Sequence, residues 1–169
     1  MKTRIIGLDP GLRITGWGII DSEGSSLSHV DHGIVTSQSE DPLSSRILSL
    51  YTQLTDIIQR YSPDEAAVEE TFMNKNPLSA LKLGTARGVV LLAPAQAGLH
   101  VAEYSANKVK KSVVGVGHAD KAQVAMMVGH LLPKSGGVTQ DAADALAIAI
   151  CHAHHRSSSR RQGRTEYSK

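Results

Sequence analysis

The chain has 169 residues, of which 41% are hydrophobic and 4% aromatic, so it is long enough for one domain with a core of its own. Its single cysteine, Cys151, excludes an internal disulfide framework and lies in an apolar run, which predicts a buried thiol in a reducing compartment. The sequence has neither a signal-peptide core nor a run of about 18 uninterrupted apolar residues. We therefore expect a cytoplasmic protein without a membrane span.

The net charge of +2 is unevenly distributed along the chain. Residues 151–169 carry five basic residues and one acidic residue, whereas the first 150 residues carry 13 basic and 15 acidic residues. The C-terminal sequence is polar, rich in serine and arginine, and without periodicity. We therefore predict a folded domain over residues 1–155 and a disordered basic tail over residues 156–169. Solvation alone and loose attraction to phosphates are equally good interpretations of this tail.

The first part of the chain is patterned as strands. Three β-type runs at 4–9, 15–21 and 26–37 are separated by connections short enough for hairpins. An amphipathic helix is predicted over 42–61, with Asp41 as its N-cap and proline at its first position. The first three strands should therefore form an antiparallel meander that leads into a helix.

Strands and helices alternate in the rest of the chain. A fourth strand is predicted over 63–72, and a helix over 76–98 follows, which Pro94 should kink or end. A fifth strand is predicted over 99–105. The remaining helices are predicted over about 106–113, 120–132 and 139–155.

This order of elements predicts an α/β fold in which helices flank a five-stranded mixed sheet. A right-handed crossover can place the fourth strand beside the first, on the side that the second strand does not occupy. The predicted strand order is 3-2-1-4-5.

Carboxylates occur where two neighbouring strands are predicted to end. Asp9 ends the first strand, and Glu69 and Glu70 end the fourth. Parallel neighbours have their carboxyl ends at the same edge, where open α/β sheets bind ligands. Asp9 and one glutamate should therefore converge, but because Glu69 and Glu70 face opposite sides of a strand, the pattern leaves open which one.

Two further aspartates lie three residues apart in the segment TQDAADALAIAI. Asp141 and Asp144 project from one face of the predicted helix. Like charges at this spacing destabilise a helix by roughly a few tenths of a kcal/mol. If Thr139 is the N-cap, the helix dipole favours Asp141 without any function, but Asp144 lies a turn deeper among apolar residues. A positive partner should offset this second charge.

All four carboxylates could gather at one sheet edge only if cations neutralised them. Sites made of carboxylate oxygens select Mg²⁺ or Mn²⁺ over zinc. Two such ions, about 3.5 to 4 Å apart, can stabilise the attacking and leaving oxygens of a phosphoryl displacement. The acidic residues therefore favour phosphodiester hydrolysis.

Four blocks of the sequence, in order between residues 4 and 155, together resemble the RuvC family of Holliday junction resolvases. They are IGLDPGLRITGWG, VEETFMNKNPLSALKLGTARG, VKKSVVGVGHADKAQV and DAADALAIAI. The resemblance implies a ribonuclease H-like fold and a homodimeric, metal-dependent endodeoxyribonuclease of DNA recombination and repair. It implies symmetric paired nicks in four-way junction DNA, and the branch-migration proteins RuvA and RuvB as partners.

The resemblance also implies roles for individual residues. The catalytic, metal-binding carboxylates would be Asp9, Glu69, Asp141 and Asp144, with two Mg²⁺ ions per active site and Mn²⁺ as a substitute. The implied DNA-binding residues are Phe72, Lys110 and Lys121, and the resemblance leaves Lys108 and Lys111 less defined. Phe72, the only phenylalanine of the chain, would stack on bases at the junction, although core packing is the alternative.

Two further features have both a structural and a functional interpretation. Gly84 and Gly88 permit close approach of a second helix, either within the subunit or, as the resemblance implies, across a dimer interface. His152, His154 and His155 could bind metal, but no acidic residue lies near them in sequence. We therefore expect a frayed, solvated helix end there.

Two other classes of function compete with the nuclease. The GLDPGLRITG loop also resembles the phosphate loop of actin-like sugar kinases and chaperone ATPases, but those proteins enclose ATP between two such domains. A junction-binding architectural protein would use Phe72 and the lysines but would not need Asp141 and Asp144. Both alternatives explain less of the sequence.

Overall fold

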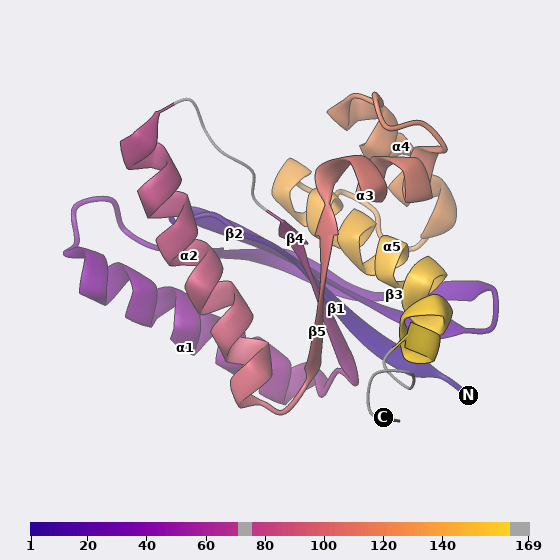
Figure 1. The fold of residues 1–169 in the computed structure, drawn as a ribbon, viewed down its shortest axis with the longest axis horizontal. Coiled ribbons are helices and arrows are strands. Elements are labelled where there is room, and N and C mark those ends of the chain that lie inside the picture. The colour runs from indigo at the N-terminus through magenta and orange to yellow at the C-terminus, as the bar shows by residue number, and fades with distance from the viewer. Residues whose placement is uncertain (71–75, 163–169) are drawn as a thin grey trace.

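The computed structural model describes residues 1–70 and 76–162, with side chains through Arg156. Its centre is a five-stranded mixed sheet in the order β3-β2-β1-β4-β5, which confirms the predicted order (Figure 1). β1 pairs with β2 and β2 with β3 in antiparallel fashion, whereas β1 with β4 and β4 with β5 are parallel. The strands are β1 (Thr3–Asp9), β2 (Ile14–Glu23), β3 (Ser26–Thr36), β4 (Glu65–Glu70) and β5 (His100–Ser105).

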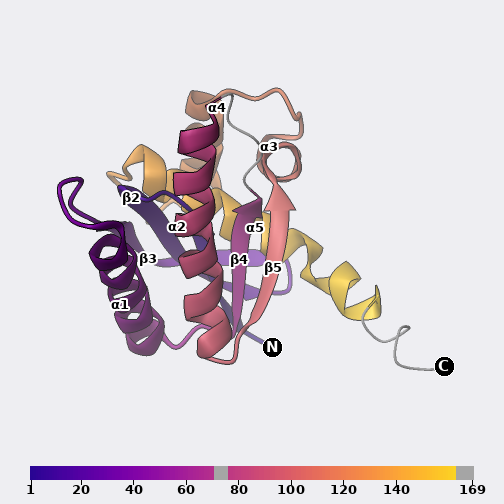
Figure 2. The same ribbon diagram turned by 60° about the vertical axis from the view of Figure 1, so that its left-hand side comes forward.

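Helices cover both faces of this sheet (Figures 1 and 2). One face carries a pair of long helices, α1 (Leu43–Tyr61) and α2 (Pro77–Gln96). The other face carries α3 (Ala106–Val114), α4 (Lys121–Leu131) and α5 (Gln140–Gln162). The fold is therefore three-layered, with the sheet between two helical layers.

The sheet separates two hydrophobic clusters because neighbouring strand residues point to opposite faces. Ile5 packs with α3, α4 and α5, whereas Ile6 packs with α1 and α2. Both side chains are completely buried. The continuous apolar run of β1 is thus explained by burial of the strand on both faces.

The structure corrects two predicted helix boundaries. α1 begins at Leu43, because Pro42 is extended, with φ −54° and ψ 145°, and itself occupies the N-cap position without a side-chain cap. Asp41 is therefore not the N-cap. α5 continues seven residues beyond the predicted end, to Gln162. Residues 163–169 of the predicted tail lie outside the described residues, so their predicted disorder stays a prediction.

The C-terminal half of α5 is fastened to the sheet by a buried polar network. His152 is 1% exposed, and its ring nitrogens lie 2.8 Å from the Tyr104 hydroxyl and 2.8 Å from Glu65 Oε2. Arg156 donates to both oxygens of Glu65 and also to Thr3 Oγ1. The expectation of a frayed, solvated end is therefore wrong for His152, because its acidic partner comes from β4, 87 positions away in sequence.

α2 has an inner and an outer face of different character. Ala86 and Val90 are fully buried, and the helix passes through the buried Pro94 before it ends at Gln96. Leu78, Leu81 and Leu92, on the outer side, are at least half exposed. Within residues 1–70 and 76–162, α2 is the single helix whose length and apolar composition would suffice to cross a membrane, and 28% of that window is buried.

Candidate active site

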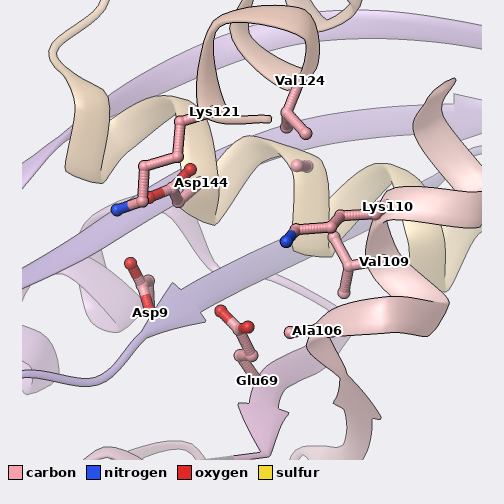
Figure 3. A pocket seen from close by; sticks show the side chains of 9 residues that line it. Asp9, Glu69, Ala106, Val109, Lys110, Lys121, Val124 and Asp144 are labelled. Atoms are coloured by element: carbon pink, nitrogen blue, oxygen red, sulfur yellow. The ribbon is translucent and has the colours of Figure 1, made fainter. Parts of the chain in front are cut away.

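Two adjacent parallel strands bring the first carboxylates together. Leu8 pairs with Val68, so Asp9 and Glu69 are the next residues along β1 and β4. Figure 3 shows both side chains at the ends of their strand arrows, pointing into the same space. The predicted convergence of a strand-end aspartate with a strand-end glutamate therefore has a direct basis in the strand register.

A cavity of about 210 Å³ lies at this sheet edge. Three carboxylates line it, from Asp9, Glu69 and Asp144, and two ammonium groups, from Lys110 and Lys121 (Figure 3). The apolar part of its lining consists of Ala106, Val109, Val124 and Ala147. Five elements, β1, β4, α3, α4 and α5, thus contribute to one charged cavity.

The other candidate residues lie around this cavity or outside the described residues. Asp141, one turn before Asp144 on α5, does not line the cavity, although its charge acts on Asp9. Glu70 does not line it either, which distinguishes it from Glu69. Lys108 lies over the Tyr104 ring, 5.2 Å from its centroid. Phe72 lies outside the described residues.

The cavity carries more negative charge than its own lysines neutralise. Burial, followed by the charges of Glu69, Asp144 and Asp141, raises the pKa of Asp9 to about 8. Burial and the charge of Asp144 also raise the pKa of Glu69. Lys121 lowers both pKa values, but it does not reverse the shifts. Such a site favours an added cation.

Asp144 is already held at both of its oxygens. Gln140 donates to Oδ1 at 3.0 Å, and Lys121 Nζ lies 3.5 Å from Oδ2. Lys121 starts α4, which Asp120 and Gln123 cap reciprocally. The capping box therefore fixes where the backbone of Lys121 lies, while its side chain remains 73% exposed.

The donor set fits a divalent cation, but its side chains are spread around the cavity. Within the part of the chain that the structure describes, no group of three or more histidine, cysteine, aspartate or glutamate side chains stands close enough together to hold a metal ion. Carboxylate oxygens without sulfur or imidazole suit a hard cation such as Mg²⁺ or Mn²⁺. An ion at this position would share Asp144 Oδ2 with Lys121 or displace it.

Comparison with known proteins identifies the family. The model of the family "Crossover junction endodeoxyribonuclease RuvC" matches residues 5–152. The chain belongs to the RuvC family. It is 61% identical to the crossover junction endodeoxyribonuclease RuvC of Xanthobacter autotrophicus over 158 residues, 94% of each chain, and 60% identical to that of Azorhizobium caulinodans over 153 residues, 90% of each chain.

A solved structure shows the same fold. The structure of T. thermophilus RuvC in complex with Holliday junction substrate covers 93% of this chain and 96% of its own, with a TM-score of 0.86 and 32% identity. The fold is ribonuclease H-like, as the sequence predicted. RuvC family members are metal-dependent nucleases, which agrees with the all-oxygen donor set of the cavity.

Three residues at the site, Gln140, Val109 and Val124, were not predicted from the sequence. Gln140 was not singled out, although its spacing of four residues from Asp144 on a helix permits the observed contact. Val109 and Val124 were read only as helix residues, and nothing in their local pattern indicates that they line a charged cavity. Their position depends on how α3 and α4 pack against α5.

Proposed function

We propose that this protein resolves four-way DNA junctions by paired, symmetric, metal-dependent phosphodiester cleavage in recombination and repair. The observation that carries the proposal is the cavity in which Asp9, Glu69 and Asp144 face Lys110 and Lys121, in a chain whose family match covers residues 5–152. Its family relatives are crossover junction endodeoxyribonucleases, and one of them is solved with a Holliday junction substrate.

The proposed metal ligands and catalytic carboxylates are Asp9, Glu69, Asp144 and, one helical turn away, Asp141. Two Mg²⁺ ions, which Mn²⁺ can replace, are proposed for each site. Bound there, divalent ions supply Lewis-acid stabilisation of phosphate oxygens and an activated water at neutral pH. Asp9 must lose its proton to become a ligand, because its pKa is about 8 in the ion-free cavity.

The lysines of the cavity are proposed to bind the DNA backbone. Lys110 and Lys121 place two positive charges beside the carboxylates, where a phosphate of the backbone would otherwise be repelled. Lys121 has a second task in this proposal, because its ammonium group occupies Asp144 until a phosphate draws it away. Both lysines contribute sequence-independent affinity that falls with salt.

Phe72 is proposed as the base-stacking residue at the junction. Phe72 follows Glu69 by three residues in sequence, and β4 ends at Glu70, at the active-site edge of the sheet. A stacked base typically contributes about 1 to 3 kcal/mol of binding. Such a contact would make binding depend on unstacked bases, which a junction offers and a linear duplex does not.

We further propose a homodimer that forms through the outer face of α2. Leu81 and Leu92 are exposed there, and no described atom lies within 4 Å of a Cβ placed on Gly84 or Gly88 between them. Among the described residues, no other element therefore packs against these glycines, and they leave room for a second backbone. A two-fold dimer would present two cavities to the two opposed strands of a junction.

The cellular setting follows from the family. Cytoplasmic localisation and cooperation with the branch-migration proteins RuvA and RuvB are proposed for a bacterial enzyme of this kind. The outer apolar face of α2 is assigned to the dimer rather than to a membrane, because Lys82 is exposed on the helix and Arg87 pairs with Glu103 of β5.

The proposal is tested with a labelled mobile four-way junction and a linear duplex of the same sequence. The protein should nick the junction in two opposed strands with Mg²⁺, and leave the duplex intact. Chelator should abolish the nicks while junction binding persists. Binding without cleavage at any Mg²⁺ or Mn²⁺ concentration would instead favour an architectural protein.

A further inference from the structure

α5 lies so close to the sheet that two strand glycines touch its backbone. A Cβ placed on Gly16 would stand 2.1 Å from the carbonyl oxygen of Asp141 and 2.6 Å from its carbonyl carbon. A Cβ on Gly7 would stand 2.1 Å from the carbonyl oxygen of Ala145. Separations below 3.0 Å do not occur at real Cβ atoms, so any side chain at either position must displace the helix backbone.

Gly16 is placed between two of the acidic residues. In the antiparallel pair of β1 and β2 it is the direct partner of Asp9. On the face that it turns to α5, it contacts the backbone of Asp141. One residue without a side chain is thus the neighbour of Asp9 in the sheet and also touches the helix that carries Asp141 and Asp144.

We propose that Gly16 is a positioning residue of the catalytic centre, because its missing side chain sets the distance at which Asp141 and Asp144 approach Asp9. The inference rests on the metal-site roles proposed above for these aspartates. The negative charge of Asp141 reaches Asp9 although Asp141 does not line the cavity, which agrees with the short separation. Gly7 supports the helix in the same way, one turn further on.

The consequence for chemistry follows from the required displacement. To admit a methyl group at Gly16, the backbone of Asp141 has to withdraw by at least 1.3 Å, from 2.1 Å to the 3.4 Å at which ordinary contact begins. A misplacement of about 1 Å in a catalytic constellation can lower the rate about 100-fold. Gly16→Ala should therefore lower kcat and weaken Mn²⁺ binding, while the cavity lysines keep their affinity for the junction.

Gly18→Ala is the matched control. Gly18 lies on the same strand and faces the same helix, but its added Cβ would meet Cδ2 and Cγ of the Leu146 side chain at 2.7 Å, and its nearest backbone atom, Leu146 N, is at 3.0 Å rather than 2.1 Å. Relief at Gly18 therefore falls mainly on the buried Leu146 side chain, whereas relief at Gly16 has to move the backbone of Asp141. This variant should lose thermal stability as Gly16→Ala does, yet keep kcat and Mn²⁺ affinity close to wild type.

A rescue variant separates positioning from general damage. Glutamate at position 141 is longer than aspartate by one methylene, which compensates for a withdrawn backbone. Asp141→Glu alone should be impaired, because the longer side chain on an undisplaced backbone moves the carboxylate away from its native position. In combination with Gly16→Ala it should recover part of the lost kcat and Mn²⁺ affinity. A loss of stability alone would not be reversed in this way.

The experiment measures single-turnover cleavage, junction affinity in chelator, direct Mn²⁺ binding by calorimetry and thermal unfolding for all variants. Reduced kcat and Mn²⁺ affinity in Gly16→Ala, with unchanged junction affinity and recovery in the double variant, would support the inference. Equal behaviour of Gly16→Ala and Gly18→Ala would overturn it. If Gly16→Ala does not fold, Gly7→Ala takes its place, because it displaces the same helix at Ala145: kcat and Mn²⁺ affinity below those of Gly18→Ala support the inference, and wild-type values overturn it.

Failure of the underlying function would look different. Asp141→Asn removes the charge without altering the helix–sheet distance. If this variant cleaves junctions as well as wild type, the role proposed for Asp141 is wrong and the positioning inference has no basis. If it is inactive while Gly16→Ala is fully active, only the inference about Gly16 fails.

Discussion

Lys121 Nζ lies 3.5 Å from Asp144 Oδ2, across the mouth of the cavity that Asp9 and Glu69 also line. The lysine therefore competes with any cation for this carboxylate. Because the Lys121 side chain is largely exposed, the ion pair contributes about 1 kcal/mol or less to stability. Replacing it should nevertheless change metal affinity measurably.

We predict that Lys121→Gln binds Mn²⁺ about two- to fivefold more tightly than wild type in the absence of DNA, by the energy of the lost ion pair. Calorimetric titration measures this directly. Lys110→Gln is the control, because Lys110 lines the same cavity but acts on Glu69 only through its charge. An equal gain in Mn²⁺ affinity in both variants would show that the total positive charge of the cavity decides the affinity, and that the ion pair with Asp144 does not. Both variants should bind the junction more weakly.

The two glutamates at the end of β4 should differ strongly in function. Glu69 lines the cavity and its pKa is raised by burial and by Asp144, whereas Glu70 does not line it. We predict that Glu69→Gln loses cleavage by about 100-fold or more, since it removes a proposed ligand. Glu70→Gln should keep most of the activity. Single-turnover rates with saturating Mg²⁺ compare them, and the reverse ranking would refute the assignment of Glu69.

Asp9 should make the ion-free protein less stable as pH rises. Burial and the charges of Glu69, Asp144 and Asp141 raise its pKa from 3.8 to about 8. The folded protein therefore keeps a proton that the unfolded chain releases, so the stabilisation is complete below about pH 4 and is lost as pH rises through 8.

Denaturant unfolding in chelator at pH 5 to 9 tests this linkage. The free energy of unfolding of Asp9→Asn should not fall with pH in this way. At pH 9 this variant should be more stable than wild type by an amount on the order of a few kcal/mol. Added Mg²⁺ should narrow the difference, because the ion replaces the proton. Parallel pH profiles of wild type and Asp9→Asn would contradict the raised pKa.

Arg156 should matter for stability and not for chemistry. It donates to both oxygens of the buried Glu65, and this contact lowers the pKa of Glu65 to about 2. Arg156→Met leaves a buried carboxylate without its main partner, which typically costs about 3 kcal/mol. The free energy of unfolding in urea should show this loss at pH 7, where the carboxylate is ionised.

The stability of the two proteins at acid pH supplies the control for Arg156→Met. The stabilisation by Glu65 is present above its ordinary pKa of 4.5 and is lost as pH falls towards 2, so wild type and Arg156→Met should converge there. Glu65→Gln should reduce the effect of Arg156→Met when the two are combined. An additive double variant would show that the pair is not coupled.

The sheet order was predictable because it depends on local signals and chain connectivity. Short connections made the first three strands a meander, and one right-handed crossover placed β4 beside β1. The same register argument predicted that Asp9 and one strand-end glutamate converge. The choice of Glu69 over Glu70 came from family resemblance, since alternation alone says only that the two differ.

The features that sequence reasoning missed arise from contacts between distant elements. The histidines of α5 had no acidic neighbour in sequence, but Glu65 of β4 meets His152 and Arg156 in the fold. The ion pair of Lys121 with Asp144 likewise depends on where α4 docks against α5. Even the start of α1 depended on the extended backbone of Pro42, which the capping pattern before it did not reveal.

The most direct test of the account compares wild type and Asp144→Asn on one labelled four-way junction, with binding and cleavage measured in the same samples. The substitution would keep the shape of the side chain but remove the charge that Lys121 and a bound cation share. We predict unchanged or tighter junction binding and a loss of paired nicks by at least about 100-fold, or roughly 2.7 kcal/mol of barrier. Cleavage by Asp144→Asn at the wild-type rate would contradict a catalytic centre in this cavity.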